Sequence, residues 1–214
     1  MTGLKPIVLL PARERVASEL RKAILSKQIG AGEVLTLETT AEQLGVSATP
    51  VREAFQILAR DGLLQLKANK GAVVLGMTRE RLSEHYQVRA ALESEACLLC
   101  CERKADLGKV EHCVTSARKA LEDGDSSGYG DFNQSFHYEL WKASGNGKLT
   151  TMLSELWNGL SMGVASTAVQ YAAVSQQEHE EILSYLLKQD RQGAWDAMHR
   201  HILRSLEDML TRYV

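Results

Sequence analysis

The stretch "LGVSATPVREAFQILARDGLL", residues 44–64, contains a turn, the start of a helix and an amphipathic helix. Gly45 permits a sharp backbone turn, Ser47 is a residue type that caps helices, and Pro50 suits a first helical turn. The helix is therefore expected to begin near residue 48. Apolar residues recur on one of its faces at helical spacing, namely Val51, Ala54, Phe55 and Leu58. That face is predicted to pack on a core, while the opposite, polar face is free to contact a partner.

The segments around this helix predict a winged-helix arrangement. Earlier helices are expected within "ERVASELRKAIL" (14–25) and "TTAEQL" (39–44), the second capped by Thr39 or Thr40. After the helix-turn-helix, "LLQLKANKGAVVLG" (63–76) has two β-prone runs around a glycine-containing turn, as in a hairpin. This order of elements predicts a winged-helix domain over residues 1–75.

Beyond Gly76 the sequence pattern is helical throughout. Residues 76–78 are expected to form a linker whose Thr78 caps the next helix, and residues 79–214 to form an all-helical bundle. Breaks in the pattern predict about six helices in this part. The breaks fall near Asp106, Gly124, Gly145 and Asn146, Ser175, and Asp190. The predicted fold class is therefore mainly α, with a three-helix winged helix-turn-helix and its β-hairpin wing followed by a helical bundle.

Composition and charge limit the possible classes of protein. The chain has 214 residues, of which 44% are hydrophobic, enough for one large or two small domains with real cores. It contains no apolar run of membrane-spanning length and no convincing signal peptide, so we expect a cytoplasmic protein without a membrane partner. Residues 1–75 contain ten Lys or Arg and seven Asp or Glu, against 15 and 20 in the remainder. This modest basic excess is weak evidence for a polyanionic partner.

The four cysteines are Cys97, Cys100, Cys101 and Cys113, and three of them lie in "EACLLCCER" (95–103). A zinc site would need a second pair of ligands, and only His112 and Cys113 follow nearby, at no familiar spacing. Buried, reduced thiols are therefore expected.

Several of these segments carry a resemblance to a known family. Residues 13–75 resemble the GntR-type winged helix, through "LRKAIL", "TAEQLGVS", "TPVREAF", "LARDGLL" and the glycine of "NKGAVV". The remainder resembles the FCD effector domain of the FadR subgroup, through "VRAALESEA", "NQSFHYELWKASGN", "EHEEILSYLLKQD" and "AMHRHI". The resemblance implies a homodimeric transcription regulator, not an enzyme, whose affinity for operator DNA changes when a small molecule, usually a carboxylate, binds the helical domain.

The polar face of the helix and the wing supply the expected DNA contacts. The DNA-binding set is Ser47, Thr49, Arg52, Gln56, Lys67 and Lys70. One departure from the family pattern is Ala48, since relatives usually have at this position an arginine that approaches the DNA, so the operator cannot be taken from a relative. Without the resemblance, such residue types also fit an ordinary solvated surface, and helix-turn-helix shapes also serve as protein contacts.

Three histidines of the helical part are predicted to point inward. His179 and His201 share helix faces with apolar residues, His137 shares a face with Asn133, and each buried imidazole needs a polar partner. A single inward histidine is usually a hydrogen-bonded core residue, but a divalent cation such as zinc or nickel would satisfy three at once. The resemblance implies a metal bound by three histidines and one acidic residue. Asn133, one turn before His137, stands at that acidic position here and is a neutral candidate ligand.

Arg89 is the candidate second anchor for a carboxylate effector, because its planar fork binds carboxylates bidentately. An intrahelical pair with Glu93 is an equally good interpretation. The function expected from all these features is a repressor controlled by a carboxylate bound at the metal. A metal sensor and, with less support, a metal-dependent hydrolase are the alternatives.

Overall fold

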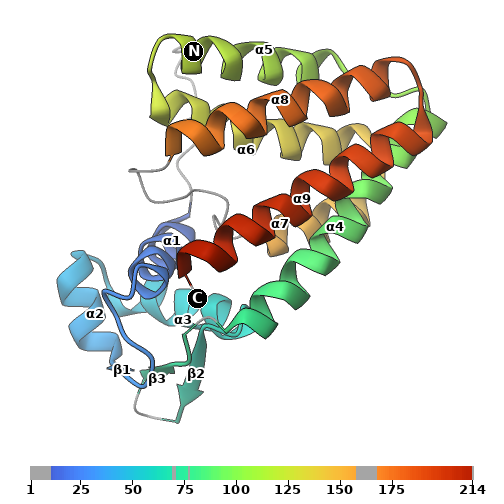
Figure 1. Cartoon of the computed structure of the whole chain (residues 1–214). Coiled ribbons are helices and arrows are strands. Elements are labelled where there is room, and N and C mark those ends of the chain that lie inside the picture. Colours follow the sequence, from blue (N-terminus) through green and yellow to red (C-terminus); the bar gives the residue numbers. More distant parts are fainter. Residues whose placement is uncertain (1–10, 69–70, 77, 158–167, 214) are drawn as a thin grey trace, which may run out of the picture. The chain divides into compact units, whose positions relative to one another are not determined.

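The computed structural model describes residues 11–68, 71–76, 78–157 and 168–213 (Figure 1). The chain divides between Thr78 and Arg79 into two compact units, here called the winged-helix unit and the helical unit. The predicted mainly α fold class is confirmed. Within the described ranges, no helix combines the length and apolar character that crossing a membrane requires.

In its described residues, the winged-helix unit contains three helices and three short strands. They are α1 (Ala12–Leu25), β1 (Val34–Leu35), α2 (Leu37–Leu44), α3 (Ala48–Arg60), β2 (Leu64–Lys67) and β3 (Gly71–Val74). The predicted hairpin is the antiparallel pair of β2 and β3, and Lys70, which was predicted at its tip, lies outside the described residues. Strand β1 was not predicted. It has two residues, and it forms because it pairs antiparallel with the edge of β3 that β2 does not occupy.

Two predictions about helix starts need correction. Helix α3 begins at Ala48 as expected, but the Ser47 side chain makes no capping hydrogen bond although the residue occupies the N-cap position. Helix α2 begins before the expected Thr39 or Thr40. Thr36 is its N-cap, because the Thr36 backbone is extended and its hydroxyl accepts a hydrogen bond from the Thr39 N–H at 3.2 Å.

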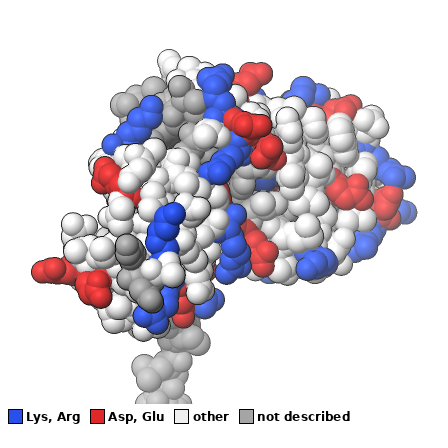
Figure 2. Space-filling model, turned by 90° about the horizontal axis from the view of Figure 1, so that it is seen from below, with Lys and Arg blue, Asp and Glu red and all other residues white. Residues whose placement is uncertain are grey.

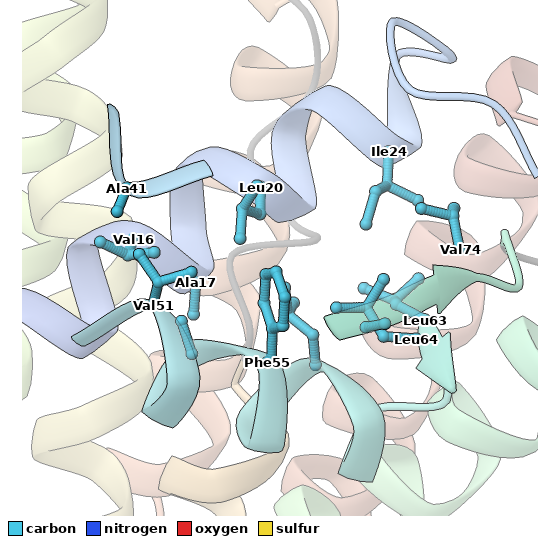
Figure 3. Packing of buried hydrophobic residues seen from close by; sticks show 13 residues of the cluster. Val16, Ala17, Leu20, Ile24, Ala41, Val51, Phe55, Leu63, Leu64 and Val74 are labelled. Atoms are coloured by element: carbon cyan, nitrogen blue, oxygen red, sulfur yellow. The ribbon is translucent and has the colours of Figure 1, made fainter. Parts of the chain in front are cut away.

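The core of the winged-helix unit is built on the apolar face of α3. Val51, Ala54, Phe55 and Leu58 are all buried, as the spacing predicted. Phe55 projects from α3 toward Leu20 of α1 and lies beside Leu63 and Leu64 (Figure 3). This packing leaves the polar face of α3 exposed.

The helical unit contains six described helices, which confirms the predicted bundle. They are α4 (Arg79–Glu102), α5 (Gly108–Glu122), α6 (Ser126–Ala143), α7 (Gly147–Leu156), α8 (Ala168–Leu187) and α9 (Arg191–Tyr213). Helices α5, α6 and α8 run side by side (Figure 1), and α4 packs against α6 and α7. The break predicted near Ser175 is wrong, because Ser175 lies inside α8. Its hydroxyl accepts a hydrogen bond from Arg204 at 2.8 Å, so it does not compete for the helix backbone.

Gly71 is expected to be essential for the sheet of the winged-helix unit. It has a φ of +87°, and a Cβ there would lie 2.0 Å from the Leu35 carbonyl oxygen of β1. Gly32 has a similar φ of +89°, but a Cβ added there would meet no atom within 4 Å, so Gly32 isolates the backbone contribution. Gly32→Ala should cost about 1–2 kcal/mol of unfolding free energy, and Gly71→Ala clearly more. Urea denaturation followed by circular dichroism measures both losses. Equal losses for the two variants would show that β1 moves away from the added Cβ without lowering the unfolding free energy.

Candidate functional site

Three histidines from three helices converge inside the helical unit. His137 lies on α6, His179 on α8 and His201 on α9, and their side chains are at most 3% exposed. One nitrogen from each ring lies within 4.8 Å of the other two. The predicted convergence of these three residues is thus present in the structure, and they are the group of His, Cys, Asp and Glu side chains, among those described, that could hold a metal ion.

Aromatic rings hold the imidazoles in place. Phe136 stacks on His179 with ring centroids 4.0 Å apart, and the His137 ring lies 4.8 Å from the Trp157 ring. His137 and His201 stack on each other at 5.3 Å. The walls of the site are therefore largely apolar, and the polar character resides in the imidazoles and the groups bonded to them.

A buried glutamate of α4 stands behind His137. Glu93 Oε2 lies 2.6 Å from His137 Nδ1 and accepts a hydrogen bond from Trp141 Nε1 at 3.2 Å, while Oε1 accepts from Arg89 Nε at 3.0 Å. Burial acts to raise the pKa of Glu93, but His137 and Arg89 hold this pKa well below its ordinary range. The carboxylate is therefore ionised, and the Nδ1–H of His137 must be the donor.

A second glutamate stands behind His201. Glu178 Oε2 lies 2.7 Å from His201 Nδ1, and both carboxylate oxygens accept from Arg204, at 2.6 Å from Nε and 2.7 Å from Nη2. Burial acts to raise the pKa of Glu178, but the hydrogen bonds from His201 and Arg204 hold it below its usual value. The Nδ1–H of His201 is therefore the donor, and its Nε2 carries a lone pair.

The pair of His179 and His201 fits a bound cation. Their Nε2 atoms are 3.3 Å apart. Two nitrogens bound to one tetrahedral zinc ion at ~2.0–2.1 Å would lie ~3.3 Å apart. Burial lowers the pKa of His201 to about 4 and that of His179 well below 6.5, so both rings are neutral and have the lone pair that a metal needs.

Asn133 is the residue predicted as the fourth ligand. It is 7% exposed and lies on α6, one turn before His137. Its amide oxygen is a neutral donor to a metal, whereas the nearby Asp131 side chain is exposed. The candidate ligand set therefore carries no charge of its own.

Arg89 was expected either to anchor an effector or to pair with Glu93 on the same helix, and the structure contains the pair with Glu93. Arg89 Nη2 lies 2.5 Å from Glu93 Oε1, and both side chains are almost fully buried. The guanidinium also lies over the Trp157 ring, 4.8 Å from its centroid. Any contact between Arg89 and an effector would share the guanidinium with Glu93.

Sequence reasoning missed the two glutamates as parts of the site. Glu93 was considered only as a partner of Arg89, and Glu178 was not singled out although it precedes His179. Neither "LESEAC" (92–97), which contains Glu93, nor "EHEEIL" (178–183), which contains Glu178, indicates which ring nitrogen of a distant histidine the carboxylate contacts. Glu178 and His201 are 23 residues apart, and only the packing of α8 on α9 brings them together.

The remaining histidines and the cysteines lie apart from this cluster. His199 stacks on Trp195 at 4.7 Å, His112 is exposed, and His85 packs edge-on against Tyr86. All four cysteines are buried and free, as expected. Burial raises the pKa of each thiol, that of Cys100 to about 12.

The residues predicted to contact DNA are exposed where the structure describes them. Thr49, Arg52 and Gln56 lie on α3 opposite its buried face, Ser47 directly precedes the helix, and Lys67 ends β2. Ala48 is exposed as well. On the face drawn in Figure 2, Lys and Arg side chains are interspersed with Asp and Glu, so charge alone does not outline a DNA surface there.

Two family models match the chain. The model of the "Bacterial regulatory proteins, gntR family" matches residues 12–74, and the "FCD domain" model matches residues 84–204. The matched relatives are transcriptional regulators, so the hydrolase alternative is excluded.

Individual relatives agree with the family models. The gluconate operon transcriptional repressor of Bacillus subtilis is 45% identical over 37% of this chain, but the match spans only 32% of that repressor's length. The regulator McbR of Escherichia coli is 26% identical over 90% of this chain and 87% of its own.

Solved structures show the same fold. A McbR structure has a TM-score of 0.70 at 22% identity, covering 96% of this chain and all of that one. A protein of Rhodococcus sp. RHA1 assigned to GntR regulators is 25% identical with a TM-score of 0.66, covering 94% of this chain and 99% of its own. The chain thus belongs to the GntR family of DNA-binding transcription regulators, with an N-terminal GntR helix-turn-helix domain and a C-terminal FCD domain.

Proposed function

We propose that this chain is a homodimeric repressor whose affinity for operator DNA changes when a small organic carboxylate binds a divalent metal ion in the helical unit. The ion, zinc or nickel by its imidazole ligands, would be held by His137, His179 and His201, with Asn133 as the fourth ligand. The observation that carries the proposal is the buried cluster of three histidines, whose ring nitrogens lie within 4.8 Å of one another. The repressing direction is supported by the name of the Bacillus subtilis relative.

The charges around the site favour an anionic effector. Glu93 is balanced by Arg89 and Glu178 by Arg204, so these groups add no net charge. The candidate ligands are neutral, and the ion would therefore keep its full positive charge in the interior. Burying an unpaired charge is costly, and an oxygen anion that coordinates the ion lowers this cost. Arg89 is the proposed second anchor, sharing its guanidinium with Glu93.

The effector can change DNA binding only if its own affinity for the chain differs between the DNA-free and the DNA-bound state. If the carboxylate binds the DNA-free state more tightly, it lowers operator affinity, and DNA lowers the carboxylate affinity by the same factor. Two copies of the helix-turn-helix in a dimer would recognise a near-palindromic operator.

For the DNA surface, Arg52→Ala is expected to weaken binding by about 1–3 kcal/mol, because an arginine on a recognition helix reads base edges. Lys67→Ala should act through phosphate contacts and reduce the slope of log affinity against log salt by about 0.9. The measurement is fluorescence anisotropy with a duplex that the wild-type chain selects from a random pool. Lys70, at the tip of the wing, is expected to behave like Lys67.

Arg60→Ala is the matched control, since Arg60 is an exposed arginine in the last turn of the same helix. It should leave sequence discrimination unchanged. Binding that is equally insensitive to Arg52→Ala and Arg60→Ala would remove α3 from the proposed DNA surface.

For the metal, protein purified without a histidine tag is expected to contain about one divalent ion per chain in elemental analysis. Chelation should lower the melting temperature, because an ion that binds only the folded chain stabilises it, by about 2.7 kcal/mol at 100 times the Kd. His179→Ala should abolish the effect, and His199→Ala, outside the cluster, should retain it. A metal-free chain that takes up no zinc or nickel would make the three histidines core residues.

For the effector, small carboxylates and hydroxycarboxylates are expected to raise the melting temperature of the metal-loaded chain and to change its operator affinity. The same compounds should have little effect on the chelated chain or on His179→Ala, because coordination supplies their binding energy. Thermal shift assays and DNA anisotropy measure the two responses. Operator affinity that follows metal alone, without any carboxylate response, would identify a metal sensor.

A further inference from the structure

In the histidine cluster, two imidazoles are each linked to an arginine by hydrogen bonds through a glutamate. Glu93 links His137 to Arg89, and Glu178 links His201 to Arg204. Among the described residues, no carboxylate bonds to His179 Nδ1. The two links differ in burial and in the helices they join.

The link at His201 determines which ring nitrogen faces the cluster. Arg204 donates to both oxygens of Glu178 and so orients the carboxylate, whose Oε2 accepts from His201 Nδ1. A neutral imidazole with its proton on Nδ1 has its lone pair on Nε2. That Nε2 atom is the one 3.3 Å from His179 Nε2.

We propose that Glu178 is a positioning residue of the metal site, fixing the tautomer and ring orientation of His201, and that Arg204 holds Glu178 in this role. The inference rests on the proposed metal site. Carboxylates that accept from the second nitrogen of a metal-bound histidine orient the ring and increase its basicity as a ligand. Nothing in the role requires Glu178 to touch the ion.

Glu178 can be tested without disturbing the fold, unlike Glu93. The Glu93 and Arg89 side chains are 0% and 2% exposed, so removing Glu93 would leave a buried charge unpaired. The Glu178 and Arg204 side chains are 22% and 26% exposed, so Arg204 can be hydrated after the loss of its partner. Arg204 also keeps its contact with the Tyr171 ring, 4.8 Å away.

The chain contains a matched control on the same two helices. Glu181 of α8 pairs with Arg200 of α9 at 3.0 Å, and both side chains are well exposed. Glu181→Gln therefore removes the same charge and the same kind of interhelical ion pair as Glu178→Gln, but from an exposed pair instead of from a carboxylate that is bonded to His201. Arg200→Gln controls Arg204→Gln in the same way.

The test is the affinity of the full chain for Zn²⁺, measured by competition with a chromogenic chelator. Glu178→Gln is expected to weaken Zn²⁺ binding about 10- to 100-fold, with a smaller loss for Arg204→Gln and none for the two controls. The absorption spectrum of bound Co²⁺ should change only in the Glu178 and Arg204 variants. Nitrogen NMR of the metal-free chain should find the single ring proton of His201 on Nδ1 in the wild type and distributed between the Nδ1 and Nε2 tautomers in Glu178→Gln.

Two failures are distinguishable. A wild-type chain that binds no Zn²⁺ overturns the proposed metal site and this role with it. A wild-type chain that binds Zn²⁺ only as tightly as Glu178→Gln, with His201 in one unchanged tautomer, overturns the role of Glu178 alone. If Glu178→Gln fails to fold by circular dichroism, Arg204→Gln decides, and an affinity equal to that of Arg200→Gln counts against the proposal.

Discussion

A carboxylate without exposed surface persists only when its charge is balanced and its oxygens accept hydrogen bonds, and Glu93 meets both conditions. Arg89 balances the charge from one turn earlier on α4, and His137 and Trp141 lie against the other oxygen from α6. Through these hydrogen bonds, Glu93 links α4 to α6 beside the histidine cluster. The packing of these two helices and the orientation of one candidate ligand depend on this one group.

The parts of the fold that follow from local spacing were predictable from the sequence. The buried face of α3 and the inward side of the histidine helices are set by the 3.6-residue repeat, which needs no knowledge of the partner. Strand β1 was not predictable, because two residues such as Val34 and Leu35 form a strand only through pairing with a distant one. The interior position of Ser175 in α8 was not predictable either, because the Arg204 side chain that bonds to its hydroxyl is 29 residues away in the sequence.

The candidate site was predictable only as far as its residue types. Three inward histidines pointed to a shared ligand, and the structure brings His137, His179 and His201 together. The hydrogen bonds that select Nδ1 or Nε2 depend on how α4 and α8 carry Glu93 and Glu178 to the rings, and a helical repeat contains no such information. For Arg89, the sequence allowed two partners, and the burial of Glu93 beside it accounts for the pair that forms.

The burial of every thiol makes the chain convenient for site-specific labelling. Maleimides and similar reagents attack the thiolate, and burial suppresses this form at Cys97, Cys100, Cys101 and Cys113. A cysteine introduced at an exposed position would therefore react far faster than the native ones, which need not be removed. Fluorophores or spin labels placed in this way on each unit would report the distance between the units as ligands are added.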